Sequence, residues 1–235
     1  MGAFGFAEGS MKKKHYFTKA EICLFSVSVL LITASFLLFD RTNYLTLAAS
    51  LIGASSLIFS AKGNPIGQAL IVIFSVLYGI ISYNFSYYGE MITYLGMTAP
   101  MSVTALISWL RNPYGGSRAE VKVNRISKRE FVFMLLLSAA VTAVFFFILR
   151  FFNTANLIPS TLSVTTSFIA VYLTFRRSAL FAAAYAMNDL ILILLWTLAA
   201  RSDMSYISVT VCFVIFLAND VYGFINWTRM FKRQN

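Results

Sequence analysis

The sequence predicts an all-α integral membrane protein with about eight transmembrane helices. We expect one additional N-terminal helix followed by a 3+1+3 bundle of two parallel three-helix repeats. The first observation is composition: of 235 residues, 59% are hydrophobic and only 12% are charged, about half the charged share of a soluble domain. The second is a series of apolar runs, several close to the roughly 20 residues that span a bilayer. The third is that Lys and Arg gather in alternate connections between these runs.

The chain begins with a polar, basic segment, residues 1–20, which we expect to be a cytoplasmic tail. The first apolar run, Ile22 to Phe39, is followed by Asp40 and Arg41. It is longer than the apolar core of a signal peptide and lacks a nearby small-residue cleavage site. We therefore predict a retained additional helix over 21–41.

Seven further apolar runs follow and divide the rest of the chain. They lie at about 44–61, 65–85, 90–110, 130–152, 161–175, 179–200 and 205–228. Residues 44–111 thus form a first three-helix repeat, 112–129 a basic loop, 130–152 a linker helix and 161–230 a second repeat. Because a single helix separates them, the two repeats must run parallel, as in several transporters that hold a solute between their halves. Their ends also match in sequence, Ile107 to Arg111 (ISWLR) and Ile225 to Arg229 (INWTR).

The distribution of Lys and Arg predicts the orientation. With the N-terminus in the cytoplasm, 16 of the 19 basic residues fall on the inner side and Arg41, Arg150 and Arg201 fall outside. This bias follows the positive-inside rule, which predicts a multi-pass protein of the cell membrane with both termini cytoplasmic. It also explains the net charge of +10 without a nucleic-acid partner.

Polar pairs interrupt the last two apolar runs at Asn188-Asp189 and Asn219-Asp220. An ionisable group within a membrane helix is costly and by default marks a functional site, although both aspartates could instead be structural. Helical spacing places these amides on faces that also carry aromatic side chains. The faces comprise Phe181, Tyr185, Asn188, Leu192 and Trp196, and Cys212, Phe216, Asn219, Gly223 and Asn226. They suit a flat, polar, ring-containing solute, so we interpret this region as half of a transport pathway.

The first repeat carries a matching stripe. Gln68, Ser75 and Ser82 recur every seven residues beside Tyr78, and Tyr94, Thr98, Ser102 and Trp109 lie near one face of the next helix. Pro100 should kink that helix, because it removes a backbone hydrogen bond, and the kink could serve as a gate pivot. Trp109 and Trp227 are expected to be anchors in the inner aromatic belt.

Enzymatic chemistry is not indicated. No His, Cys or carboxylate cluster has metal-ligand spacing, and no P-loop is present, so we expect no metal, no cofactor and no catalytic residues. A substrate-binding subunit of an ATP-driven vitamin importer and a scaffold without a solute remain as alternatives.

Several ordered pieces of the sequence resemble the PnuC family over residues 44–230. The first repeat contributes LYGII (77–81), YYGE (87–90), Pro100-Met101 and Trp109, and the second contributes NDVYGFINW (219–227). The resemblance implies a 3+1+3 fold like that of the SWEET sugar transporters, and facilitated diffusion of nicotinamide riboside with metabolic trapping. It also implies a homotrimer. Some members carry thiamine, riboflavin or nucleosides instead.

The chain departs from the nicotinamide riboside members at a few positions. Asn188 fits the amide of their penultimate helix, but Phe181 and Ala184 fall where two tryptophans would be, and Ser102 replaces a frequent Asn. The solute therefore stays open between nicotinamide riboside and another nucleoside or vitamin, such as a deoxynucleoside, thiamine or riboflavin. The residues predicted to bind it are Gln68, Tyr78, Thr98, Tyr185, Asn188, Asp189, Trp196, Asn219 and Tyr222.

Overall fold

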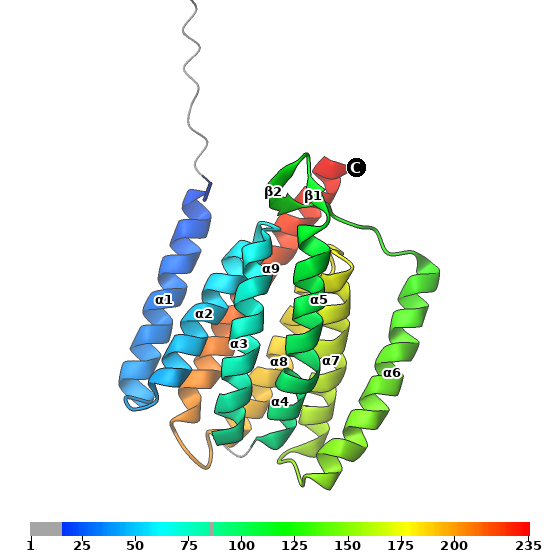
Figure 1. Cartoon of the computed structure of the whole chain (residues 1–235). Coiled ribbons are helices and arrows are strands. Elements are labelled where there is room, and N and C mark those ends of the chain that lie inside the picture. Colours follow the sequence, from blue (N-terminus) through cyan, green and yellow to red (C-terminus); the bar gives the residue numbers. More distant parts are fainter. Residues whose placement is uncertain (1–15, 85–86) are drawn as a thin grey trace, which may run out of the picture.

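A computed structural model describes residues 16–84 and 87–235, and in these ranges eight helical segments are long and apolar enough to cross a membrane. They run side by side as one bundle (Figure 1). The chain is therefore an all-helical multi-pass membrane protein, as the sequence predicts. The helices are α1 (Lys19–Phe39), α2 (Tyr44–Ala61), α3 (Pro65–Asn84), α4 (Tyr88–Thr93), α5 (Ala99–Leu110), α6 (Lys128–Phe151), α7 (Leu157–Phe175), α8 (Phe181–Ala199) and α9 (Tyr206–Gln234).

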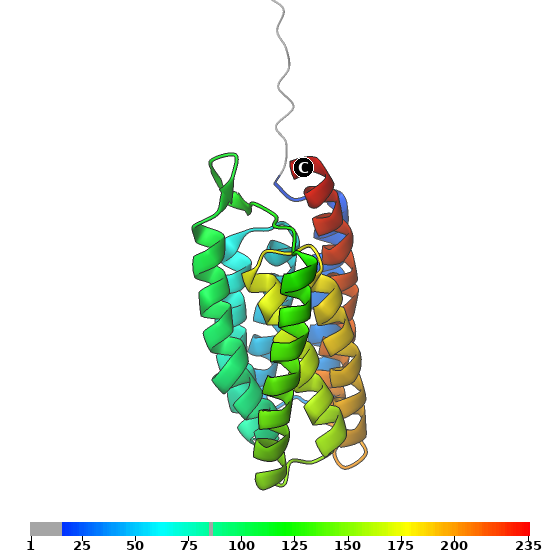
Figure 2. The ribbon, with the colours of Figure 1, turned by 90° about the vertical axis from the view of Figure 1, so that its right-hand side faces the viewer.

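Six of these helices form a ring. Helix α3 packs against α2 and α5, α7 against α5 and α8, and α9 against α8 and α2. The first repeat supplies α2, α3 and α5, and the second supplies α7, α8 and α9 in the same order around the ring. Helices α1 and α6 lie outside it at opposite sides, α1 against α2 and α9, and α6 against α7 (Figures 1 and 2). The two repeats thus form equivalent halves, joined at the α5–α7 and α9–α2 contacts.

The two contacts between the halves are held by equivalent tryptophans. The Trp109 indole on α5 donates to the Thr174 carbonyl on α7 at 2.9 Å, and the Trp227 indole on α9 donates to the Ser60 carbonyl on α2 at 2.7 Å. Both side chains are fully buried, and their ring centroids lie 5.3 Å apart. The prediction that they are anchors in the inner aromatic belt was wrong, because both side chains are buried and each indole N–H bonds across the boundary between the repeats.

The first helices of the two repeats also end alike. Each is followed by a residue in the left-handed region, Gly63 (φ 68°) after α2 and Arg177 (φ 55°) after α7. In both, the next amide bonds back to a carbonyl five residues earlier, Asn64 to Phe59 and Ser178 to Leu173, each at 3.0 Å. This is the closing bond of a Schellman motif. At both places the motif turns the chain sharply toward the second helix of the repeat.

The fourth spanning segment, Tyr88–Leu110, is not one regular α-helix. A π-helical turn, η1 (Tyr94–Thr98), joins α4 to α5, and the Ala99 amide bonds to the Tyr94 carbonyl five residues back. Such a turn absorbs the irregularity that Pro100, which has no amide hydrogen, introduces at the start of α5. The interruption predicted at Pro100 is therefore present as a π-turn on its N-terminal side.

The basic loop after α5 is more ordered than expected. It contains a short antiparallel hairpin, β1 (Pro113–Tyr114) and β2 (Ser117–Val121), turned at Gly115 and Gly116, which both have positive φ. Val121 and Val123 are buried beside Trp109 and Trp227. The hairpin therefore packs against the end of the ring at which the C-terminus also lies (Figure 1).

Polar contacts attach α1 to the ring. Both carboxyl oxygens of Glu21 lie 3.1 Å from the Lys62 ammonium, and Glu21 also accepts from the Tyr222 hydroxyl at 2.9 Å. Deeper in the bundle, the Asn219 amide donates to Ser28 at 3.0 Å. Because both acceptors are on α1, these contacts fix its rotation and height against α2 and α9.

Candidate functional site

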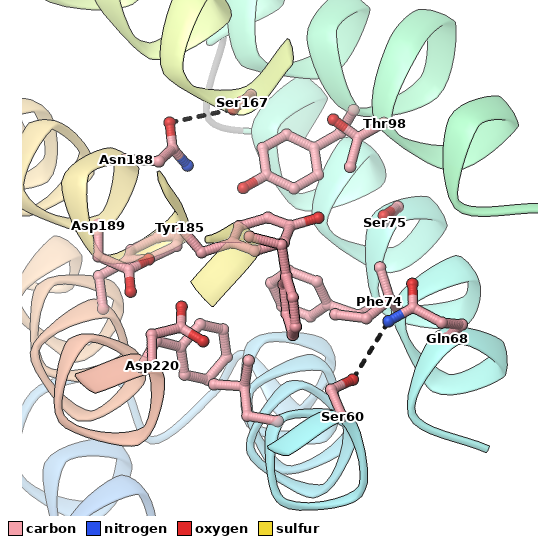
Figure 3. Close-up of a pocket in the computed structure, with 16 residues that line it drawn as sticks. Ser60, Gln68, Phe74, Ser75, Thr98, Ser167, Tyr185, Asn188, Asp189 and Asp220 are labelled. Carbon is pink, nitrogen blue, oxygen red and sulfur yellow. Dashed lines mark hydrogen bonds between the residues drawn. The ribbon is translucent and has the colours of Figure 1, made fainter. Parts of the chain in front are cut away.

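An internal cavity lies inside the six-helix ring (Figure 3). Its empty volume is about 590 Å³, of which only about 40 Å³ is wide enough for the centre of a water molecule. The space is therefore narrow, and a solute could enter only if the ring opened. Both halves line it, through Leu57, Ser60, Gln68, Ile71, Phe74, Ser75, Tyr94, Thr98, Ser167, Phe181, Tyr185, Asn188, Asp189, Phe213, Phe216 and Asp220.

Five of the predicted site residues reach this cavity: Gln68, Thr98, Tyr185, Asn188 and Asp189. The first two come from the first repeat and the other three from α8. The side chain of Gln68 donates to the Ser60 hydroxyl at 3.3 Å. The helices approach closely here because residue 67 is glycine: a Cβ at Gly67 would lie 2.6 Å from the Ser60 backbone nitrogen. This contact places the Gln68 amide at the cavity wall.

Asn188 is oriented by α7. Its side-chain oxygen accepts hydrogen bonds from Thr166 at 2.8 Å and Ser167 at 3.0 Å. In Figure 3 the oxygen points to Ser167 and the amino group points into the cavity. The two hydroxyls therefore occupy the acceptor side of the amide, which leaves its N–H₂ as the donor for a solute.

Asp189 and Asp220 lie next to each other at the cavity. Asp189 comes from α8 and Asp220 from α9, and their carboxyl groups are within hydrogen-bonding reach and face one another (Figure 3). Both residues are buried, and one oxygen of Asp189 has no hydrogen-bond partner. The predicted site includes Asp189 and omits Asp220, although the repeated Asn-Asp pair in the sequence could have signalled both.

Tyr78 and Trp196 lie beyond the cavity, toward the end of the bundle at which α8 ends. The Trp196 indole donates to the Tyr78 hydroxyl at 2.5 Å, and its ring lies 4.8 Å from that of Tyr87. Both side chains are buried and Tyr78 stacks on Phe74, a cavity residue. They form a first aromatic layer that closes the cavity from one side.

Asn219 and Tyr222 do not reach the cavity, contrary to our expectation. Asn219 bonds to Ser28 and to the Ile215 carbonyl, and Tyr222 bonds to Glu21. Both therefore face α1 and hold that helix in place. Helical spacing could not reveal this, because Asp220, next to Asn219, takes the cavity-facing position on α9.

The opposite end of the cavity, where α8 begins, is closed by a second aromatic layer of three residues. Phe181 lines the cavity and lies 4.7 Å from Trp227 and 6.1 Å from Trp109, measured between ring centroids. Together with the first layer of Tyr78 and Trp196, this layer separates the cavity from both ends of the bundle. The geometry is that of an occluded state in an alternating-access transporter.

Several cavity residues were absent from the predicted site. Ser75 belongs to the polar stripe noted in the sequence, and its hydroxyl is buried without a partner, as is that of Thr98. The remaining additions are mainly aromatic and small polar side chains, of which Tyr94, Phe181 and Phe216 lie on the helix faces noted in the sequence. They are Leu57, Ser60, Ile71, Phe74, Tyr94, Ser167, Phe181, Phe213 and Phe216.

The chemistry of the cavity is that of binding. Six aromatic rings supply flat surfaces, the amides and hydroxyls supply hydrogen bonds, and Asp189 and Asp220 supply two acidic groups. Within the described ranges, no group of three His, Cys, Asp or Glu side chains is placed to hold a metal ion. The arrangement suits a planar ring that carries polar substituents.

Comparisons with known proteins agree with this geometry. A model of the family described as "Nicotinamide mononucleotide transporter" matches residues 43–229. The "Nicotinamide riboside transporter PnuC" of Neisseria mucosa is 28% identical over 209 residues, which cover 87% of this chain and 79% of that protein. The crystal structure of the vitamin B3 transporter PnuC superimposes with a TM-score of 0.82 at 25% identity, over 93% of this chain and 94% of that one. These matches confirm the resemblance to PnuC. They also confirm the prediction that the protein is a transporter and not an enzyme. The chain belongs to the nicotinamide mononucleotide transporter family.

Proposed function

We propose that this protein takes up nicotinamide riboside by facilitated diffusion, with net uptake maintained by cytoplasmic conversion of the solute. The observation that carries the proposal is the occluded cavity between the two halves, lined by aromatic rings and hydrogen-bonding groups. The relative from Neisseria mucosa is named for nicotinamide riboside, and the solved structure is that of a vitamin B3 transporter. Both support this solute.

The cavity offers groups that match nicotinamide riboside. Its pyridine ring can lie between aromatic side chains, where stacking adds about 0.5–1.5 kcal/mol to burial. Its carboxamide and ribose hydroxyls need partners, because an unpaired buried polar group costs about 1–3 kcal/mol. The Asn188 amino group and the unpartnered Ser75 and Thr98 hydroxyls can provide them. Phe181 replaces a tryptophan of the nicotinamide riboside members but keeps an aromatic face in the cavity.

Transport should require only this chain and a concentration gradient. In liposomes without ATP, membrane potential or pH gradient, internal nicotinamide riboside should rise to the external concentration and stop. Enclosing a nicotinamide riboside kinase with ATP should then drive further uptake, because phosphorylation lowers the internal concentration of nicotinamide riboside. Radiolabel retained on filters measures both phases, with protein-free liposomes as the control. Accumulation driven by a pH gradient alone, or uptake that needs an ATPase subunit, would contradict the mechanism.

We further propose that the protein lies in the cell membrane with both termini cytoplasmic. The structure supports a common side, since Tyr16 and Arg233, near the two ends of the described chain, line the same surface pocket. The positive-inside bias of the sequence supports the cytoplasm as that side.

The family resemblance also favours a homotrimer. One chain has a mass of 26.3 kDa, and light scattering on the purified protein should give three times that mass.

Cysteine labelling tests the orientation. In a background with Cys23 replaced by serine, a cysteine at Asn235 should resist a membrane-impermeant maleimide in intact cells and react after the cells are opened. The matched control is a cysteine at Arg201, an exposed residue in the loop between α8 and α9 at the opposite end. It should react in intact cells. The reverse labelling pattern would invert the orientation.

A further inference from the structure

Asp189 and Asp220 form an acidic pair with no basic partner in the cavity. None of the 16 residues that line the cavity is Lys, Arg or His. The described ion pairs, Lys62–Glu21, Arg176–Glu130 and Arg233–Glu120, lie elsewhere. Buried carboxylates are normally paired with a cation or hydrogen-bonded throughout, whereas one oxygen of Asp189 has no partner at all. The pair therefore has no counter-charge among the residues that line the cavity.

The surroundings of the pair favour an organic cation over a metal ion. Hard metal ions take six or more oxygen ligands, and within the described residues no third acidic or thiol side chain joins the two carboxyls. The cavity instead presents aromatic rings, among them Tyr185, Tyr94 and Phe216. The faces of aromatic rings attract cations through their quadrupole, most strongly where water is excluded. A cationic ring would therefore meet complementary charge on both the carboxyl and the aromatic surfaces.

Further polar groups in the same cavity are also unpartnered. The hydroxyls of Ser75 and Thr98 are buried and form no hydrogen bond within the protein. They lie on the first repeat, while the acidic pair lies on the second. A solute that spans the cavity would place its charge at the acidic pair and its own hydroxyls toward Ser75 and Thr98.

We propose that Asp189 and Asp220 are the cation-recognition subsite of this cavity, and that the transported solute carries a positive charge on a planar ring. The proposal rests on the transport function proposed above and narrows its solute. Nicotinamide riboside carries a permanent charge on its pyridinium ring, and thiamine carries one on its thiazolium ring. Riboflavin and the ordinary nucleosides are neutral. The acidic pair thus selects the first two from the solutes that the family resemblance implies.

A neutral isostere of the solute tests the proposal on the unmodified protein. Benzamide riboside keeps the shape, the carboxamide and the ribose of nicotinamide riboside but replaces the pyridinium by a neutral carbon ring. Isothermal titration calorimetry on purified protein should give a dissociation constant at least about tenfold lower for nicotinamide riboside than for benzamide riboside, since bonds to charged groups are the stronger ones. Equal affinities for the two ribosides would overturn the proposal without any mutation.

Substitutions of the two aspartates then test whether they cause the preference for the charged riboside. Asp189→Asn and Asp220→Asn should each weaken nicotinamide riboside binding about tenfold or more and change benzamide riboside binding less than about threefold, so that the preference is largely lost. Asp203→Asn is the matched control, because Asp203 is exposed in the loop between α8 and α9. It should leave both affinities unchanged. A preference that survives in both variants of the pair would place the cation elsewhere.

The binding results distinguish failure of the cation subsite from failure of the proposal that nicotinamide riboside is the solute. If nicotinamide riboside does not bind but thiamine does, the same comparison with the neutral analogue 3-deazathiamine tests the acidic pair, and a cation preference there supports it. Binding of riboflavin or a neutral nucleoside alone would overturn the cation subsite and leave a transporter of another solute. A protein that binds neither cation would overturn both the subsite and the proposed solute.

Discussion

Replacing Trp227 by alanine is expected to destabilise the protein by about 3–5 kcal/mol, the usual cost of removing a buried tryptophan or phenylalanine side chain. Trp227 is fully buried between Trp109 and Phe181. It also holds α9 against α2 through its bond to the Ser60 carbonyl. Removing it would leave a cavity at one of the two contacts that close the ring. Thermal unfolding in detergent, followed by intrinsic fluorescence or by aggregation, measures the loss.

Two further variants identify the source of the effect. Trp227→Phe keeps most of the ring and loses the indole N–H, so it should cost only about 0.5–1.5 kcal/mol, the net value of one hydrogen bond. Phe151→Ala removes an aromatic side chain of α6 that is 79% exposed, and it should change stability little. If Trp227→Ala unfolds at the same temperature as Phe151→Ala, the contact between α9 and α2 is not an anchor of the fold.

Replacing Asn188 by leucine is expected to weaken solute binding roughly tenfold or more, equivalent to about 1.4 kcal/mol or more, with the protein still folded. The substitution keeps the volume of the side chain and removes the amino group that points into the cavity (Figure 3). The solute would then bury an acceptor without a partner, which costs about 1–3 kcal/mol. Calorimetric titration with nicotinamide riboside, alongside thermal unfolding of the same preparation, separates binding from folding.

Asn219→Leu is the matched control, because it makes the same chemical change on the neighbouring helix. Asn219 bonds to Ser28 of α1 and does not line the cavity. The variant should therefore lower stability and leave the affinity of the folded protein unchanged. If Asn219→Leu weakens binding as much as Asn188→Leu, or if Asn188→Leu binds like the parent, the assignment of the cavity as the solute site is wrong.

The helical segments could be predicted from the sequence because burial in a bilayer depends on local composition. A run of about 20 apolar residues must form a helix in lipid, since every backbone amide needs an internal partner there. The helix count and the parallel repeats follow from this constraint and from the order of the segments. The hairpin at Pro113–Val121 did not follow, because its burial depends on Trp109 and Trp227, which are far from each other in the chain.

The sequence by itself determined that this is a membrane protein of two parallel repeats, and it marked the helices that carry the polar groups. Only the tertiary structure decided which polar groups face the cavity. Asn219 and Asp220 are adjacent, yet Asp220 points inward beside Asp189 while Asn219 points outward to α1. The apolar pattern could not settle this, because a helix in contact with neighbours on several sides has no single hydrophobic face to fix its rotation. The rotation of α9 is set by Trp227 on the inner side of the ring and by the contacts of Asn219 and Tyr222 with α1.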